Sequence, residues 1–176
     1  MLSVSTIFKF YADDSLKLKL KEWMMLAITN RYTDDYTNKI EIANLVVFCE
    51  KLQKVIEALY LLSVAYTEDI HEEVLNLNNS CVFLTEEEQN NPYIVLKAFK
   101  NQFPLIHVQS EMWDIFHAIV RYKEHKEIKR HTLVDTFKDL FCIAQAAFIQ
   151  QEDENLLTIL KKLRTEQKNQ VAKNNF

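Results

Sequence analysis

Apolar side chains recur along this chain with the spacing of α-helices rather than of strands. Near the start they fall three or four positions apart from Leu16 to Ile28, so they share one face of a helix. The same period continues through residues 38–66, whose last turns, ALYLLSVAY, are apolar nearly all round. We therefore expect a long second helix with its last turns at the centre of the core.

Helix-start signals divide the rest of the chain. Thr85 and Glu88 have the spacing of a capping box, and Asn91 before Pro92 predicts a capped helix with proline at its first position. A break is expected at residues 150–155, and the tail, residues 168–176, is expected to fray. The remaining helices are expected to start near Thr67, Pro104, Thr132 and Leu156.

The chain of 176 residues contains no glycine. Glycine-rich phosphate loops, dinucleotide fingerprints, nucleophile elbows and EF-hand loops all need glycine at fixed positions, so these devices are excluded. Tight β-hairpins also favour glycine. We predict an all-α protein, a bundle of about six to seven helices that forms one domain over residues 1–176.

The two halves of the chain resemble each other at an offset of 89 or 90 residues, which aligns Trp23 with Trp113. The pattern predicts an internal repeat of residues 7–66 and 96–150, joined by a connecting region at residues 76–92. Two pseudo-symmetric three-helix halves would then meet in one core, with both tryptophans inside it. The alternative is coincidence, because any two amphipathic helices match by period alone.

Charge and cysteine content bear on the compartment and the partners. The net charge of −4 is uneven: residues 34–90 are acidic, and the basic excess lies in residues 121–131 and 161–173. The three cysteines lie far apart without CxxC spacing, which indicates buried thiols in a reducing compartment. With no apolar run long enough to span a membrane and no signal-like start, we expect a cytoplasmic protein. We also expect no cofactor, because the glycine-dependent binding motifs are missing.

One candidate metal site can be assembled from helical spacing. Glu68-x-x-His71 and Asp114-x-x-His117 follow the pattern of di-iron carboxylate bundles, in which residues three apart on a helix hold one metal. Two lone glutamates from other helices, for example Glu50 or Glu57, could complete such a site. The alternative is structural, since acids in a first turn complement the helix dipole and a polar stripe faces solvent.

The basic residues offer two further hypotheses. A possible anion-binding set consists of Arg121, Lys126, Lys129 and Arg130. Arg121 and His125 also resemble the Arg–His pair of helical ribonucleases of the HEPN type, although their spacing is shorter than in that family. The alternative is an exposed helix end whose cations interact with the C-terminal dipole.

No motif in the sequence exceeds its structural explanation. We therefore expect a non-enzymatic helical interaction or regulatory module that binds another protein or self-associates, because an acidic middle beside a basic second half suits charge-complementary pairing. The alternative is a nucleic-acid-associated protein that uses basic residues 121–131 and 161–173. A di-metal carboxylate bundle and a HEPN-like ribonuclease are remoter alternatives.

Overall fold

The computed structural model describes residues 8, 13–31, 36–65, 81–121 and 130–174. Within these ranges it contains seven α-helices and no strand, which confirms the predicted all-α bundle. None of these helices is both long and apolar enough to cross a membrane. The helices are α2 (Asp13–Arg31), α3 (Tyr36–Ala65), α6 (Glu86–Asn90), α7 (Tyr93–Gln102), α8 (Leu105–Arg121), α9 (Arg130–Ile149) and α10 (Glu154–Asn174).

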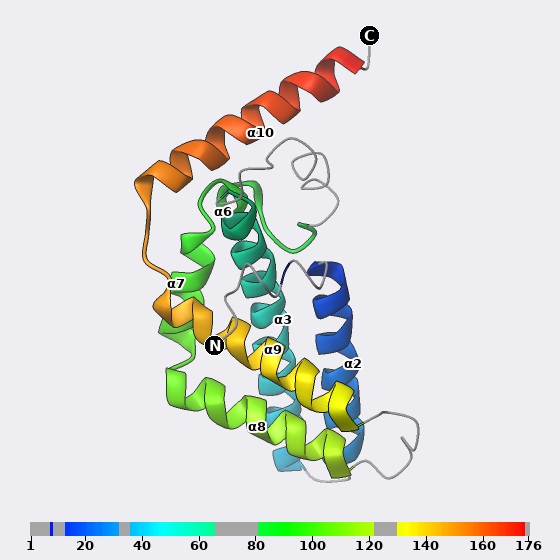
Figure 1. Cartoon of the computed structure of the whole chain (residues 1–176). Coiled ribbons are helices and arrows are strands. Elements are labelled where there is room, and N and C mark those ends of the chain that lie inside the picture. The colour runs from blue at the N-terminus through cyan, green and yellow to red at the C-terminus, as the bar shows by residue number, and fades with distance from the viewer. Residues whose placement is uncertain (1–7, 9–12, 32–35, 66–80, 122–129, 175–176) are drawn as a thin grey trace.

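Helix α3 is the centre of the molecule. It packs against α2, α7 and α9 along its length, and α10 crosses near its C-terminal end (Figure 1). Leu52, Val55 and Ile56 of α3 are completely buried. Its last turns are buried as well, since Leu61, Leu62 and Val64 are each 2% exposed. The expectation that these turns lie at the centre of the core is therefore confirmed, because a helix surrounded on all sides can be apolar nearly all round.

Aromatic rings join the central helix to its neighbours. Phe48 of α3 lies 5.3 Å from Phe103 and 6.1 Å from Phe99 of α7, measured between ring centroids. Phe148 of α9 packs against Phe99 at 6.2 Å. These edge-to-face and tilted contacts fix how α7 and α9 lie on α3.

One predicted helix cap differs from the structure. Asn91 does not cap α7: the helix begins at Tyr93 after Pro92, and the Asn91 Oδ1 atom is buried without a hydrogen-bond partner. The reason is that the first N–H groups of α7 already have backbone acceptors: Ile94 donates to the Asn91 carbonyl oxygen and Val95 to the Pro92 carbonyl oxygen, each at 3.1 Å. The fraying of residues 168–176 stays a prediction: α10 continues to Asn174, and residues 175–176 lie outside the described residues.

The two tryptophans are not equivalently placed. Trp23 is 5% exposed, as expected, but Trp113 is 45% exposed, so the prediction that it lies in the core is wrong. Met112 is completely buried and takes the inward position, and a step of one residue turns Trp113 about 100° away from it. The unequal burial contradicts the expected equivalence of the two residues, and the internal repeat stays a prediction from sequence alone.

Candidate functional site

The proposed metal ligands are not assembled within the described residues. Asp114 and His117 lie on α8, where Asp114 is half-buried and His117 is exposed beside the Trp113 ring at 5.8 Å. Glu68 and His71 lie outside the described residues. Across the part of the chain that the structure describes, no group of three or more His, Cys, Asp or Glu residues could hold a metal ion.

Glu57, considered above as a metal ligand, has another role. Its carboxylate is completely buried and accepts a hydrogen bond from the Lys17 ammonium of α2 at 2.8 Å. The backbone N–H groups of residues 82, 83 and 84 also donate to it, at 2.9, 2.9 and 3.1 Å. Lys17 is itself only 6% exposed. The carboxylate is therefore fully engaged in joining α2, α3 and the segment before α6.

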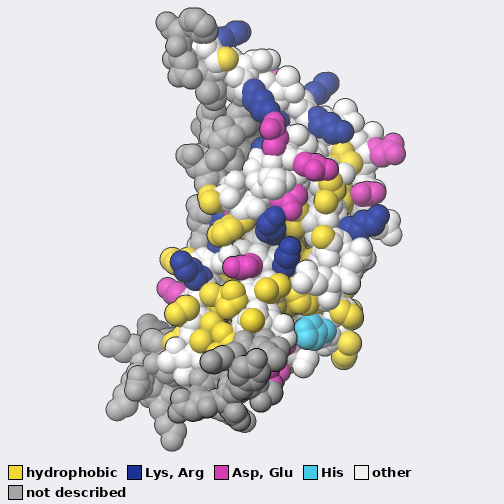
Figure 2. Space-filling view, turned by 180° about the vertical axis from the view of Figure 1, so that it is seen from behind, with side chains coloured by type: hydrophobic (Ala, Val, Ile, Leu, Met, Phe, Trp, Pro, Cys, Tyr) yellow, Lys and Arg dark blue, Asp and Glu magenta, His cyan; other side chains and the backbone are white. Residues whose placement is uncertain are grey.

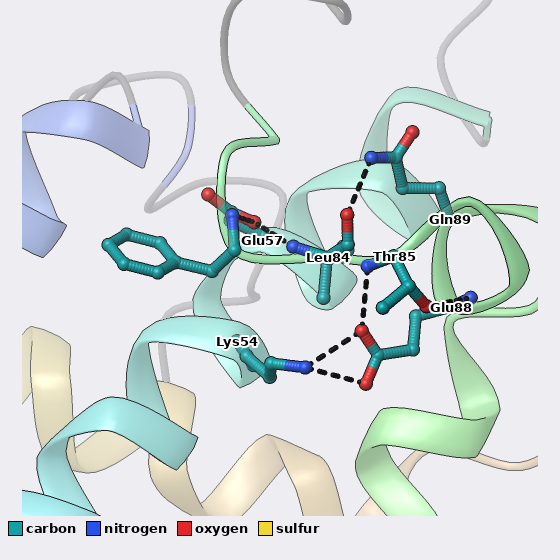
Figure 3. A network of polar contacts seen from close by, with 7 residues as sticks. Lys54, Glu57, Leu84, Thr85, Glu88 and Gln89 are labelled. Carbon is teal, nitrogen blue, oxygen red and sulfur yellow. Dashed lines mark hydrogen bonds and ion pairs between the residues drawn. The ribbon is translucent and has the colours of Figure 1, made fainter.

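A second group of polar contacts continues from this segment into α6 (Figure 3). The predicted capping box is confirmed: the Glu88 N–H donates to Thr85 Oγ1 at 3.2 Å, and the Thr85 N–H donates to Glu88 Oε2 at 2.8 Å. Lys54 of α3 donates to both Glu88 oxygens at 2.7 and 2.8 Å. Burial raises the pKa of Glu88, but the bonds from Lys54 and Thr85 outweigh it and leave this pKa lowered.

Two of the three cysteines have thiols that are poor nucleophiles. Cys49 and Cys81 are buried and Cys142 is half-buried. Burial, followed by the nearby charges of Glu111 and Glu50, raises the pKa of Cys49 to about 12. Burial also raises the pKa of Cys142. Because the thiolate is the nucleophile, both thiols are unsuited to nucleophilic catalysis at neutral pH.

The structure describes only two members of the predicted anion-binding set. Arg121 is the last residue of α8 and Arg130 the first of α9, and their side chains are not described. Lys126, Lys129 and the ribonuclease candidate His125 lie outside the described residues.

The second basic region, residues 161–173, lies on α10, which crosses over α6 (Figure 1). Arg164 Nη1 donates to Asn90 Oδ1 at 3.1 Å and to the Glu86 carbonyl oxygen at 3.4 Å, and Lys168 pairs with the Glu86 carboxylate. A pocket of about 220 Å³ lies at this crossing. Its lining residues are Asn90, Lys161, Arg164, Thr165 and Lys168.

Charges of both signs surround this region. In Figure 2, Lys and Arg side chains lie among Asp and Glu side chains over the upper part of the molecule, and hydrophobic side chains gather lower down. Burial lowers the pKa of Arg164, against the opposing influence of Cys81 and Glu86, and a guanidinium stays charged at neutral pH. Positive potential is thus local to the pocket rather than spread over a whole face.

The sequence pattern missed an outward-facing row of side chains on α8. Ile106, Trp113 and Val120 are 75%, 45% and 56% exposed, and each is seven residues from the next. Ser110 and His117 lie between them on the same face and are also exposed. We call these five residues the α8 stripe. The seven-residue spacing was the available signal, but polar Ser110 and His117 lie between the apolar residues and obscure it.

Aromatic packing against α9 holds the middle of the α8 stripe. The rings of Trp113 and Phe137 are 4.6 Å apart, and Phe116 is also 4.6 Å from Phe137. Phe116 in turn packs on Trp23 of α2 at 6.3 Å. Trp113 is therefore fixed by its inner edge while nearly half of its surface faces outward, which is the arrangement of a rigid contact residue.

A comparison of the chain with protein-family models, curated proteins and solved structures found no match.

Proposed function

We propose that this protein is a non-enzymatic helical module that binds proteins through the α8 stripe, with a second copy of the chain as its partner. The observation that carries the proposal is the exposure of three large apolar side chains, Ile106, Trp113 and Val120, along one face of one helix. Single exposed apolar residues are normal on a protein surface, whereas several large ones aligned on one helix face are typical of an interaction site.

The spacing of the α8 stripe favours a second copy over an unrelated surface. Ile106 and Val120 each lie seven residues, about two turns, from Trp113. If two α8 helices pair antiparallel about a two-fold axis at Trp113, Ile106 of each chain meets the partner's Val120. A spacing of seven residues also keeps a row of side chains along a neighbouring helix. The α8 stripe is thus complementary to itself.

The polar members of the α8 stripe are compatible with burial in such a pair. Ser110 and His117 carry neither a carboxylate nor an ammonium group, so closing the seam buries no fixed charge from these positions. Trp113 would lie at the centre of the contact, where aromatic residues contribute most of the binding energy.

Sedimentation equilibrium over a range of protein concentrations tests the proposal. We expect a reversible monomer–dimer equilibrium. Trp113→Ala should weaken the dimer by about 30-fold, since truncation of a central tryptophan costs about 2 kcal/mol or more. Ile106→Glu should weaken it by about tenfold or more, because it places a charge in the seam.

A matched control separates the α8 stripe from general surface hydrophobicity. Ile149 of α9 is 68% exposed, close to the 75% of Ile106, but it lies outside the α8 stripe. Ile149→Glu should therefore leave the dimer unchanged. A monomer at every concentration would refute the proposal, and so would equal weakening by the two glutamate substitutions.

The second candidate function is association with nucleic acid, and the cations of α10 favour it. Lys161, Arg164 and Lys168 recur at three- and four-residue spacing, so they share one side of the helix. A mobility-shift titration at low and near-physiological salt tests this candidate, because neutralisation of phosphates makes binding steeply dependent on salt. Binding that is absent at low salt would exclude it.

A further inference from the structure

The pocket between α6 and α10 combines a basic lining with fixed hydrogen-bond donors. Lys161 and Lys168 lie seven residues apart on α10, with Arg164 and Thr165 between them on the same side. Asn90, the last residue of α6, completes the lining. The pocket is independent of the α8 stripe, so its assignment does not rest on the proposed self-association.

The existing contacts leave donors available. Arg164 uses Nη1 for its bonds to Asn90 and to the Glu86 carbonyl, which leaves Nη2 and Nε of the guanidinium. Asn90 accepts through Oδ1, so its amide nitrogen is left to donate. Among the residues that the structure describes, the Lys161 ammonium has neither an ion pair nor a hydrogen bond.

The charge of the pocket suits a doubly charged anion. Three cations line it, and the Glu86 carboxylate, which pairs with Lys168, offsets one of them. Two positive charges are left, and a phosphate monoester carries about −1.5 to −2 at neutral pH. Arg164 is half-buried, so its guanidinium acts where solvent screening is reduced. A guanidinium also matches the geometry of phosphate oxygens, with two parallel hydrogen bonds.

We propose that this pocket binds a phosphoryl group, either as free phosphate or as the phosphate of a small monoester. The volume of about 220 Å³ leaves room for one phosphate with part of its ester group. The short lining, five residues where two helices cross, distinguishes this hypothesis from tracking of a nucleic-acid backbone, which requires an extended basic groove.

Isothermal titration calorimetry with inorganic phosphate, and separately with phenyl phosphate, tests the proposal at an ionic strength held constant with chloride. We expect saturable binding with one site per chain. Binding of both ligands assigns the phosphoryl group as the determinant, and binding of phosphate alone assigns the free ion. In NMR spectra, the Asn90 side-chain amide should shift during the same titration.

Two adjacent lysines provide the matched variants. Lys161 lines the pocket and Lys162 does not, although both are exposed and both are on α10. Lys161→Gln should weaken phosphate binding by about tenfold through loss of a charge-assisted bond. Lys162→Gln, which removes the same charge, should change it by less than about twofold.

Three results would overturn the proposal. One is the absence of saturable phosphate binding, and the second is equal weakening by the two substitutions, which would indicate diffuse charge attraction. The third is binding of an oligonucleotide with a steep salt dependence while phosphate and phenyl phosphate do not bind. That result would favour the nucleic-acid candidate instead.

Discussion

Replacement of Glu57 by glutamine should destabilise the fold more than most single substitutions can. The carboxylate accepts from Lys17 and from three backbone N–H groups, and it is completely buried. Glutamine keeps one acceptor oxygen, but its NH2 group faces donors, and Lys17 loses its counter-charge while only 6% exposed. Breaking a buried pair in this way costs about 3–5 kcal/mol, out of a typical total stability of about 5–15 kcal/mol.

Urea unfolding followed by circular dichroism measures this loss, and hydrogen exchange locates it. The amides of residues 82–84 should lose protection in Glu57→Gln, because their acceptor is the Glu57 carboxylate. Glu50→Gln is the matched control, since Glu50 lies on the same helix but is exposed. If both variants lost less than about 1 kcal/mol and exchange at residues 82–84 stayed unchanged, the role assigned to Glu57 would be wrong.

Two further predictions concern α6 and the thiols. Thr85→Ala removes the cap of α6 and should lower the free energy of unfolding in urea by about 1 kcal/mol. Thr158→Ala, at an exposed position on α10, should lower it by less than about 0.5 kcal/mol, and equal losses would contradict the role of the cap. Burial raises the pKa of Cys49 from 9.0 to about 12, so its contribution to stability is complete below about pH 9 and falls as the pH rises towards 12. Between pH 9 and 10 the free energy of unfolding of the wild-type protein should fall by about 1 kcal/mol more than that of Cys49→Ser. Parallel curves of unfolding free energy against pH would refute this.

The helices were predictable because their signals are local. Apolar spacing alone located α2 and α3, and the Thr85–Glu88 pair correctly marked the start of α6. Asn91 was misassigned because one residue between two helices can serve either of them, and the tertiary contacts decide which. Trp113 was misassigned because helical periodicity does not reveal which residues beside the buried face stay exposed once the helices pack together.

The candidate sites were harder to predict, because they depend on contacts between distant segments. Lys17 looks like a solvent-facing residue in LKLKLK, and its burial follows only from Glu57, which lies 40 positions later. The α10 cluster was recognised as basic from composition. Its pocket, however, also needs Asn90 and the backbone of Glu86, more than 70 positions earlier. Periodicity carries no information about such pairings.

Helix α10 extends beyond the core, and the helical state of its C-terminal part depends on the place where it crosses α6. Leu156, Leu160 and Leu163 are buried, but no described side chain after Leu163 is. The eleven residues that follow within α10 are fewer than the ~12–15 that an isolated helix needs to be even marginally stable in water. Their helical state therefore depends on continuity with the anchored turns and on the contacts of Arg164 and Lys168 with α6. The outer part of α10 and the position of α6 should consequently melt as one cooperative unit.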